Sequence, residues 1–149
     1  MNELNGYDIE DLEVGMTATF SKTITEADIV LFAGASGDNN AIHINEAFAK
    51  TTPFKGRIAH GFLTASTISA AIANRLPGPG TIYLSQQMSF LGPVRPGDTV
   101  DAVVTVKELI RDKSRAVLET VCSVEGAVVV SGEALVKTTS AAKRIAIAS

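Results

Sequence analysis

The sequence predicts an α+β fold in which an antiparallel sheet wraps around one long, apolar central helix. In the second half of the chain, period-two alternation recurs in segments joined by short turns. This pattern is typical of an antiparallel meander with one covered face. Residues 61–76 form an apolar helical stretch whose single charge is Arg75, and such a helix is expected to be buried nearly all round. Nothing else in the chain is apolar enough to cover the sheet.

Length, composition and charge fit a single domain over residues 1–149. The chain is 46% hydrophobic, which is enough apolar material for a real core. Its net charge is −3 with no basic block, and this argues against nucleic acid or a membrane surface as a partner. The single cysteine, Cys122, cannot form an internal disulfide and fits a reducing compartment. No secretory signal or membrane span is visible, so a cytoplasmic location is expected.

The first third of the chain is predicted to be irregular and helical. Residues 17–23 alternate enough to form a short strand. Thr25 is typical of a helix N-cap, and two carboxylates follow in the first turn, where the helix dipole favours them. This helix is expected to end at Gly37. Asn45 can cap a second, short helix over 46–50.

The remainder of the chain is predicted to contain the central helix and four strands. The run Leu76-Pro77-Gly78-Pro79-Gly80 ends the helix. The expected strands are 81–91, 99–110, 115–124 and 127–137. In the first three of these strands, alternate residues form an apolar face. The faces are Ile82, Leu84, Met88 and Phe90 in 81–91; Val100, Ala102, Val104, Val106 and Ile110 in 99–110; and Ala116, Leu118, Cys122 and Val124 in 115–124. An open sheet leaves edges that pairing with a second copy would protect. The tail 140–149 is expected to be disordered or a fraying helix.

The segment between the first two predicted helices carries the strongest indication of chemistry. Asp38 and His43 stand five residues apart, in a stretch rich in residues that accept turn conformations, and we expect a tight loop rather than a helix or strand. Such a loop can turn a carboxylate and an imidazole toward one point. That pair is the usual equipment for general acid–base chemistry near neutral pH.

The two polar motifs together resemble a known family. The string Ser36-Gly37-Asp38-Asn39-Asn40-Ala41-Ile42-His43, followed by Ala59-His60-Gly61-Phe62 at the start of an apolar helix, resembles the MaoC-like hot-dog hydratases. The similarity is greatest to the short (R)-specific enoyl-CoA hydratases and extends over about 12–137. Weaker matches are Leu76-Pro77-Gly78-Pro79-Gly80-Thr81-Ile82-Tyr83 and Phe90-Leu91-Gly92-Pro93-Val94-Arg95-Pro96-Gly97-Asp98. Ala41 stands where the family loop usually has proline, which predicts a looser turn.

The resemblance implies a fold, a reaction and a set of roles. It implies a hot-dog fold and reversible hydration of a trans-2-enoyl-CoA to the (R)-3-hydroxyacyl-CoA, with Asp38 and His43 as the catalytic dyad. The backbone N–H of Gly61, at the start of the central helix, would stabilise charge on the thioester oxygen. Neither a metal nor a redox cofactor is implied. The family further implies a homodimer whose two sites are built partly from both subunits.

Other candidate residues have two interpretations each. His60 could cap the helix start or pack beneath the loop, and Asn40 could support the pocket. Ser66 and Ser69 could line the acyl pocket, or bond back to the helix backbone. Lys55 and Arg57 could contact the phosphates of coenzyme A, or simply be solvated charges. Asp38, His43 and His60 could in principle supply three metal ligands, but no His-x-x-x-His or cysteine pair supports a metal.

Two rival functions remain open at this stage. The first is the same chemistry on an acyl-carrier-protein substrate, as a 3-hydroxyacyl dehydratase; the short dehydratases typically carry a glutamate on the long helix, and 62–76 contains no acidic residue. The second is thioester hydrolysis or acyl-CoA binding on the same fold, because a fold does not fix a function. A hot-dog thioesterase would also need a carboxylate on the helix or the adjacent strand.

Overall fold

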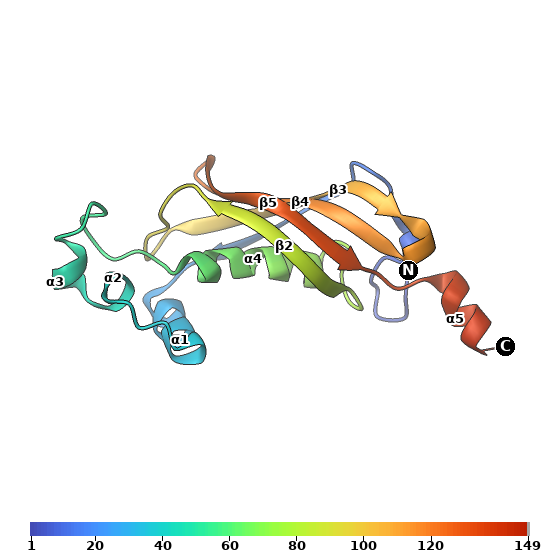
Figure 1. Ribbon diagram of the computed structural model, residues 1–149, viewed down its shortest axis with the longest axis horizontal. Helices are drawn as coiled ribbons and strands as arrows, with labels where there is room; N and C mark the ends of the chain where they lie inside the picture. The colour runs from blue at the N-terminus through green and yellow to red at the C-terminus, as the bar shows by residue number, and fades with distance from the viewer. Residues whose placement is uncertain (149) are drawn as a thin grey trace.

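The protein is described here by a computed structural model over residues 1–148 (Figure 1). The elements in chain order are the short 3₁₀ helix η1 (Ile9–Asp11), β1 (Thr17–Thr23), α1 (Glu26–Ser36), α2 (Ala41–Ile44), α3 (Glu46–Ala49), α4 (Gly61–Asn74), β2 (Ile82–Phe90), β3 (Thr99–Ile110), the 3₁₀ helix η2 (Arg111–Lys113), β4 (Arg115–Val124), β5 (Ala127–Lys137) and α5 (Ala141–Ala148). No helix within residues 1–148 is long and apolar enough to cross a membrane.

The predicted arrangement of sheet and helix is confirmed. The five strands form one sheet in the order β1-β3-β4-β5-β2, and every neighbouring pair is antiparallel. The helix α4 lies lengthwise along one face of this sheet, against β3, β1 and β4 (Figure 1). Helices α2 and α3 project beyond one end of the sheet, with α1 below that end, and α5 projects beyond the other end (Figure 1). The buried core lies between α4 and the inward side chains of the central strands.

Local sequence signals account for α1. The Thr25 side chain accepts from the N–H of Asp28 at 3.1 Å, and the Asp28 carboxylate accepts from the N–H of Thr25 at 2.9 Å. This reciprocal capping box fixes the first turn. The helix ends at Gly37, whose φ of 77° is left-handed and suits glycine. Both predicted boundaries of α1 are confirmed.

The stretch after α1 differs from its prediction. The tight loop was expected to cover residues 38–43, but it ends at Asn40. His43 lies instead on the one-turn helix α2. The Asn40 side chain accepts from the N–H of Ile42 at 3.2 Å and so caps this turn. Ala41 is the first residue of α2 and follows Asn40 in an extended conformation (φ −56°, ψ 128°), a position that proline would also accept. The short helix predicted after Asn45 is confirmed as α3.

Two β-bulges correct the predicted strand faces. In β2 the register shifts between Tyr83 and Ser85, so Tyr83 pairs with an inward position of β5 and Ile82 lies on the face opposite to Met88. In β3 the shift between Val106 and Glu108 brings Leu109 rather than Ile110 to the core. An extra residue in one strand reverses the alternation beyond it, and a period-two pattern read straight through the bulge assigns the wrong face. The remaining positions from Val100 to Val106 and from Ala116 to Cys122 are inward as predicted.

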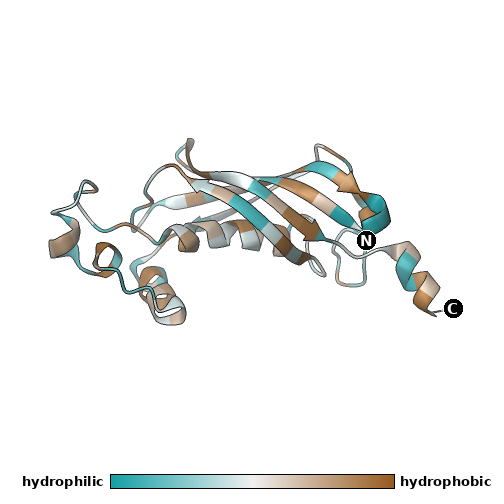
Figure 2. Ribbon diagram, viewed as in Figure 1, coloured by the Kyte–Doolittle hydropathy of each residue, from teal (hydrophilic) through white to brown (hydrophobic). Residues whose placement is uncertain are grey.

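The prediction that α4 is buried nearly all round is wrong. One stripe of the helix is exposed, made of Phe62, Ser66, Ser69 and Ala73. Figure 2 shows α4 in brown and white along its length, with little of the teal that marks hydrophilic residues. The stripe is exposed because it lies on the side of the helix opposite to the buried residues that pack against the sheet. An uncharged exposed stripe of this kind is typical of a contact surface.

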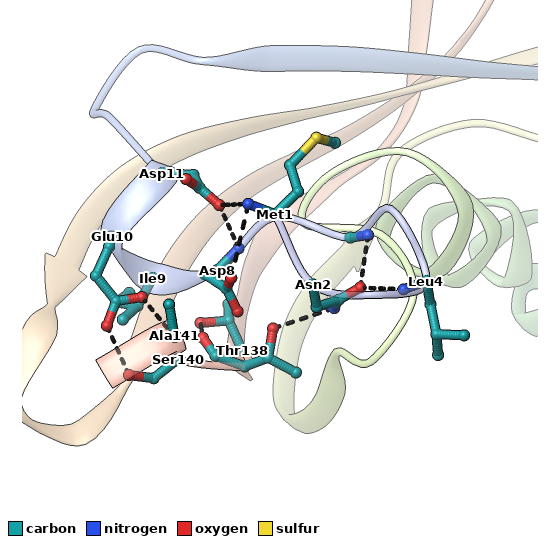
Figure 3. Close-up of polar contacts among 12 residues, drawn as sticks. Met1, Asn2, Leu4, Asp8, Ile9, Glu10, Asp11, Thr138, Ser140 and Ala141 are labelled. Carbon is teal, nitrogen blue, oxygen red and sulfur yellow. Dashed lines mark hydrogen bonds and ion pairs between the residues drawn. The ribbon is translucent and has the colours of Figure 1, made fainter. Parts of the chain in front are cut away.

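The tail forms a helix that closes onto the N-terminal segment (Figure 3). The carboxylate of Glu10 accepts from Ser140 Oγ at 2.6 Å and from the N–H of Ala141 at 3.1 Å, at the start of α5. The buried carboxylate of Asp8 binds Arg144 through both oxygens, at 2.6 and 2.8 Å. The tail is therefore helical through Ala148, and only residue 149 of the predicted tail lies outside the described residues.

Candidate active site

Asp38 stands on the exposed turn between α1 and α2. Its Oδ1 accepts from the N–H of Asn40 at 3.1 Å, and its own N–H donates to Ser36 Oγ at 3.0 Å. These two bonds form a local turn of the kind that aspartate favours. They fix the backbone around the carboxylate and leave Oδ2 open to a ligand.

The imidazole of His43 forms a hydrogen bond with a backbone carbonyl. It lies on α2 with 8% of its surface exposed, and its Nδ1 is 2.8 Å from the main-chain oxygen of Ile58. A carbonyl oxygen can only accept, so Nδ1 carries the proton of this bond. In the neutral ring the lone pair is then on Nε2, which makes Nε2 the atom able to take a proton.

His60 lies directly beneath both of these residues. Its Nε2 is 3.0 Å from the main-chain oxygen of Asp38, its ring lies 3.9 Å from the His43 ring between centroids, and Phe32 packs on it at 4.8 Å. It occupies the N-cap position of α4 without a capping hydrogen bond from its side chain. Of the two roles predicted for His60, packing beneath the loop is the one observed. One nitrogen or oxygen atom from each of Asp38, His43 and His60 lies within 4.8 Å of the others.

Gly61 starts α4 and lies at the wall of a cavity. The first intrahelical bond runs from the N–H of Thr64 to the oxygen of His60 at 3.1 Å, so the N–H of Gly61 precedes the helical ladder. A Cβ at Gly61 would come within 2.8 Å of the Phe90 ring. Any larger residue here would therefore require the Phe90 ring to move.

The cavity joins the polar residues to an apolar chamber. Its volume is about 520 Å³, a size suited to a small ligand or an acyl chain. His43 and Gly61 stand in its wall, and the rest of the lining is mostly apolar: Phe54, Ile58, Ala59, Phe62, Thr64, Phe90, Leu91, Gly92, Pro93, Val94 and Val130. Sequence reasoning did not assign this lining, although Phe62 belongs to the second polar motif and residues 90–94 to one of the weaker family matches, which is the signal that could have identified them.

The three clustered polar side chains are close enough together to be metal ligands as well as acid–base groups. The rings of His43 and His60 lie against each other at an interplanar angle of 30°. One ring nitrogen of each is already within hydrogen-bond distance of a backbone oxygen, Nδ1 of His43 with Ile58 and Nε2 of His60 with Asp38. These contacts leave Nε2 of His43 and Nδ1 of His60 as the remaining ring nitrogens.

The other predicted pocket residues are spread around the site. Asn40 acts as the cap of α2. Ser66 donates to the oxygen of Leu63 at 2.6 Å, which is the helix back-bonding expected as its alternative. Ser66 and Ser69 both lie on the exposed stripe of α4 and outside the lining of the cavity.

The two predicted phosphate ligands differ in their surroundings. Arg57 binds Glu26 of α1 at 2.6 Å and Glu46 of α3 at 3.0 Å. Both bonds raise the pKa of the Arg57 guanidinium, and the bond with Glu26 has the larger effect. Its charge is thus already compensated. Lys55 is exposed, has a positive φ of 59°, and forms no ion pair with any of residues 1–148.

Comparison with known families identifies the family of this chain. Residues 11–128 match the family described as MaoC like domain. The match covers most of the chain, and this protein belongs to the MaoC-like family. Its fold is accordingly the hot-dog fold that the sequence motifs predicted.

Curated relatives and solved structures are similar to this protein over most of its length. This chain is 54% identical over 127 residues to an (R)-specific enoyl-CoA hydratase of Rhodospirillum rubrum, and the match covers 85% of this chain and 88% of the relative. It is 53% identical over 135 residues to a 3-hydroxybutyryl-CoA dehydratase of Methylorubrum extorquens, covering 91% and 86%. Among solved structures, the unliganded R-hydratase PhaJ1 of Pseudomonas aeruginosa matches with a TM-score of 0.86 and 44% identity, covering 91% of this chain and 87% of that one.

Proposed function

We propose that this protein catalyses the reversible addition of water to a trans-2-enoyl-CoA, giving the (R)-3-hydroxyacyl-CoA. One observation carries the proposal: His43 and Gly61 stand in the wall of an apolar cavity, and a carboxylate oxygen of Asp38 lies within 4.8 Å of a ring nitrogen of His43. The two curated relatives that are more than half identical to this chain are named as an enoyl-CoA hydratase and a 3-hydroxybutyryl-CoA dehydratase.

The proposed chemistry assigns the water to the dyad. Its two hydrogens meet two acceptors, Nε2 of His43 and the open oxygen of Asp38. As the water oxygen bonds to Cβ of the enoyl group, the pair takes one proton and returns a proton to Cα, so the net change is the addition of H₂O. We treat the two residues as a unit, because closely coupled groups share their titration. General acid–base catalysis of this kind contributes about 10²- to 10⁴-fold.

The thioester oxygen has a separate partner. Negative charge develops there when Cβ is attacked, and the N–H of Gly61 at the positive end of α4 is suited to stabilise it. Loss of a single donor of this type costs about 2.7–4 kcal/mol of barrier in other enzymes. The acyl chain would occupy the apolar part of the cavity.

We further propose that the protein works as a homodimer and without a metal or other cofactor. The stripe of α4 is exposed and β2 is an edge strand of the sheet, and both are surfaces that a second copy would cover. The proposed steps use only the dyad and the N–H of Gly61 and need no metal. Activity that is unchanged after dialysis against EDTA is the expected result, and loss that zinc restores would contradict this part of the proposal.

The test of the function is hydration of crotonyl-CoA, followed as loss of the conjugated enoyl absorbance. We expect activity in the wild type and a fall of about 10²-fold or more in both Asp38→Asn and His43→Gln, with circular dichroism unchanged. Release of free coenzyme A thiol without hydration would indicate a thioesterase instead. Activity on the acyl-carrier-protein thioester but not on crotonyl-CoA would favour the dehydratase alternative.

A further inference from the structure

His60 contacts the chain at three points of the proposed catalytic apparatus. Its Nε2–H donates to the main-chain oxygen of Asp38, the face of its ring covers the face of His43, and its carbonyl carbon is bonded to the nitrogen of Gly61. Asp38 and His43 precede His60 by 22 and 17 residues in the sequence, and Gly61 is the next residue. The side chain of His60 therefore joins Asp38 and His43, and its main chain continues directly into Gly61.

The other ring nitrogen of His60 has no partner. The residue is 1% exposed, and its Nδ1 is buried without a hydrogen bond to any of residues 1–148. A buried acceptor without a partner is unfavourable for folding, and an apolar side chain of similar shape would avoid this cost. The imidazole at this position is thus better explained by its effect on its neighbours than by its own contribution to stability.

The bond to Asp38 also fixes the tautomer of His60. The partner is a carbonyl oxygen, which can only accept, so the proton must be on Nε2. A ring that donates from this edge stands with its face against His43 and cannot rotate without breaking the bond. His43, in turn, is fixed at Nδ1 by Ile58. The carboxylate of Asp38 and the Nε2 of His43 are consequently held by two backbone carbonyl contacts and one stacked pair of rings.

We propose that His60 is a positioning residue for the hydratase reaction. It sets the spacing between the carboxylate of Asp38 and the imidazole of His43 and aligns both with the N–H of Gly61, without touching the substrate: His60 is absent from the lining of the cavity. The proposal rests on the proposed function. It predicts that the loss of His60 lowers the rate of the chemical step while substrate affinity is kept, because the apolar pocket that binds the acyl chain is unchanged.

Two variants separate the two contacts of the ring. His60→Phe keeps a flat face against His43 but removes the donor to Asp38, and His60→Gln keeps an N–H near the position of Nε2 but removes the stacked ring. Misplacement of catalytic groups by about 1 Å can cost about 10²-fold in rate. We expect kcat for crotonyl-CoA to fall by about 10- to 100-fold in each variant, with KM within about twofold of the wild type. His60→Ala, which removes both contacts, should fall further than either.

Thr67 offers a matched control on the same helix. It is also buried and polar, and it donates to the oxygen of Thr64 at 2.7 Å, but it is outside the cavity lining and faces Cys122. Thr67→Val should change the thermal midpoint and leave kcat unaltered. If both the Phe and Gln variants of His60 keep wild-type kcat, or lose activity only in proportion to a loss of folded protein, His60 is a structural residue and the proposal is wrong.

A spectroscopic measurement tests the geometry independently of activity. Long-range ¹⁵N–¹H correlation on the wild-type protein should report the Nε2–H tautomer for His60 and the Nδ1–H tautomer for His43. An Nδ1–H tautomer at His60 would contradict the bond to Asp38 and overturn the proposal, even if the Phe variant does not fold. Absence of hydratase activity in the wild type would instead refute the proposed function, and it would be distinguished from failure of the positioning role by this spectrum.

Discussion

The Nδ1 atom of His43 lies 2.8 Å from the main-chain oxygen of Ile58. This bond joins the one-turn helix α2 to the segment that leads into α4. It gives His43 two separable properties, since the Nδ1 edge stabilises the local structure and the Nε2 edge remains for chemistry. A substitution can therefore remove one property and keep the other.

His43→Asn tests this separation. The amide nitrogen of asparagine can reach the position of Nδ1 and keep the bond to Ile58, but the side chain has no equivalent of Nε2. We expect kcat to fall by about 10²- to 10⁴-fold with little change in the thermal midpoint. His43→Leu should lose the same activity and in addition about 1 kcal/mol of folding free energy, measured by urea denaturation. Equal stability of the two variants would mean that the bond to Ile58 contributes nothing.

Substitutions of Lys55 and Arg57 should differ in their effect on KM when a substrate with phosphates is compared with one without. Arg57 is already paired with Glu26 and Glu46, whereas Lys55 has no ion-pair partner among residues 1–148. We expect Lys55→Gln to raise KM for crotonyl-CoA several-fold and to leave KM for crotonyl-N-acetylcysteamine unchanged. Arg57→Gln should cost at most about 1 kcal/mol of stability, because both carboxylates are largely exposed, and should change neither KM. An Arg57 effect confined to the CoA substrate would show that the arginine leaves its carboxylates to bind phosphate.

The contact between Asp8 and Arg144 predicts a stability change in acid. Hydrogen bonding to Arg144 lowers the pKa of the Asp8 carboxyl from 3.8 to about 2. Because the folded pKa is below the ordinary value, the contribution is fully present above about pH 4 and is lost as the pH falls toward 2. We expect Asp8→Asn to lose up to about 2 kcal/mol relative to wild type at neutral pH, and the difference to shrink between pH 4 and 2. Urea denaturation at several pH values measures it, with the exposed Glu13→Gln as control.

A charge on the exposed stripe of α4 should disrupt the proposed dimer. Ala73 is exposed near the end of the helix, well away from the cavity lining. We expect Ala73→Arg to convert the wild-type dimer to a monomer in light scattering after size exclusion, because two copies of an unpaired cation would meet in an apolar contact. Thr19→Arg, on the exposed side of β1, should leave the mass unchanged. A wild-type monomer, or a dimer in the Ala73 variant, would contradict the use of this stripe.

Several features could be predicted from the sequence because they depend on neighbours in the chain. The capping box at Thr25 and the left-handed turn at Gly37 are set by residues within one helical turn. The apolar alternation from Val100 to Val106 needs no partner to be recognised. The spacing of Asp38 and His43 identified the candidate site for the same reason, since a short, turn-rich segment keeps its members close.

Other features were decided only by contacts between distant segments. The bulge after Tyr83, the exposed stripe of α4 and the compensation of Arg57 all depend on which strand or helix lies alongside. The tautomer of His43 is set by a backbone oxygen 15 residues away, and a carbonyl leaves no trace in the identity of the residue that carries it. The sequence by itself thus determined the helix caps, the main strand faces and the candidate residues of the dyad. The tertiary structure decided how the dyad is oriented and which surfaces stay open, because packing free energy between remote segments overrides local preference where the two conflict.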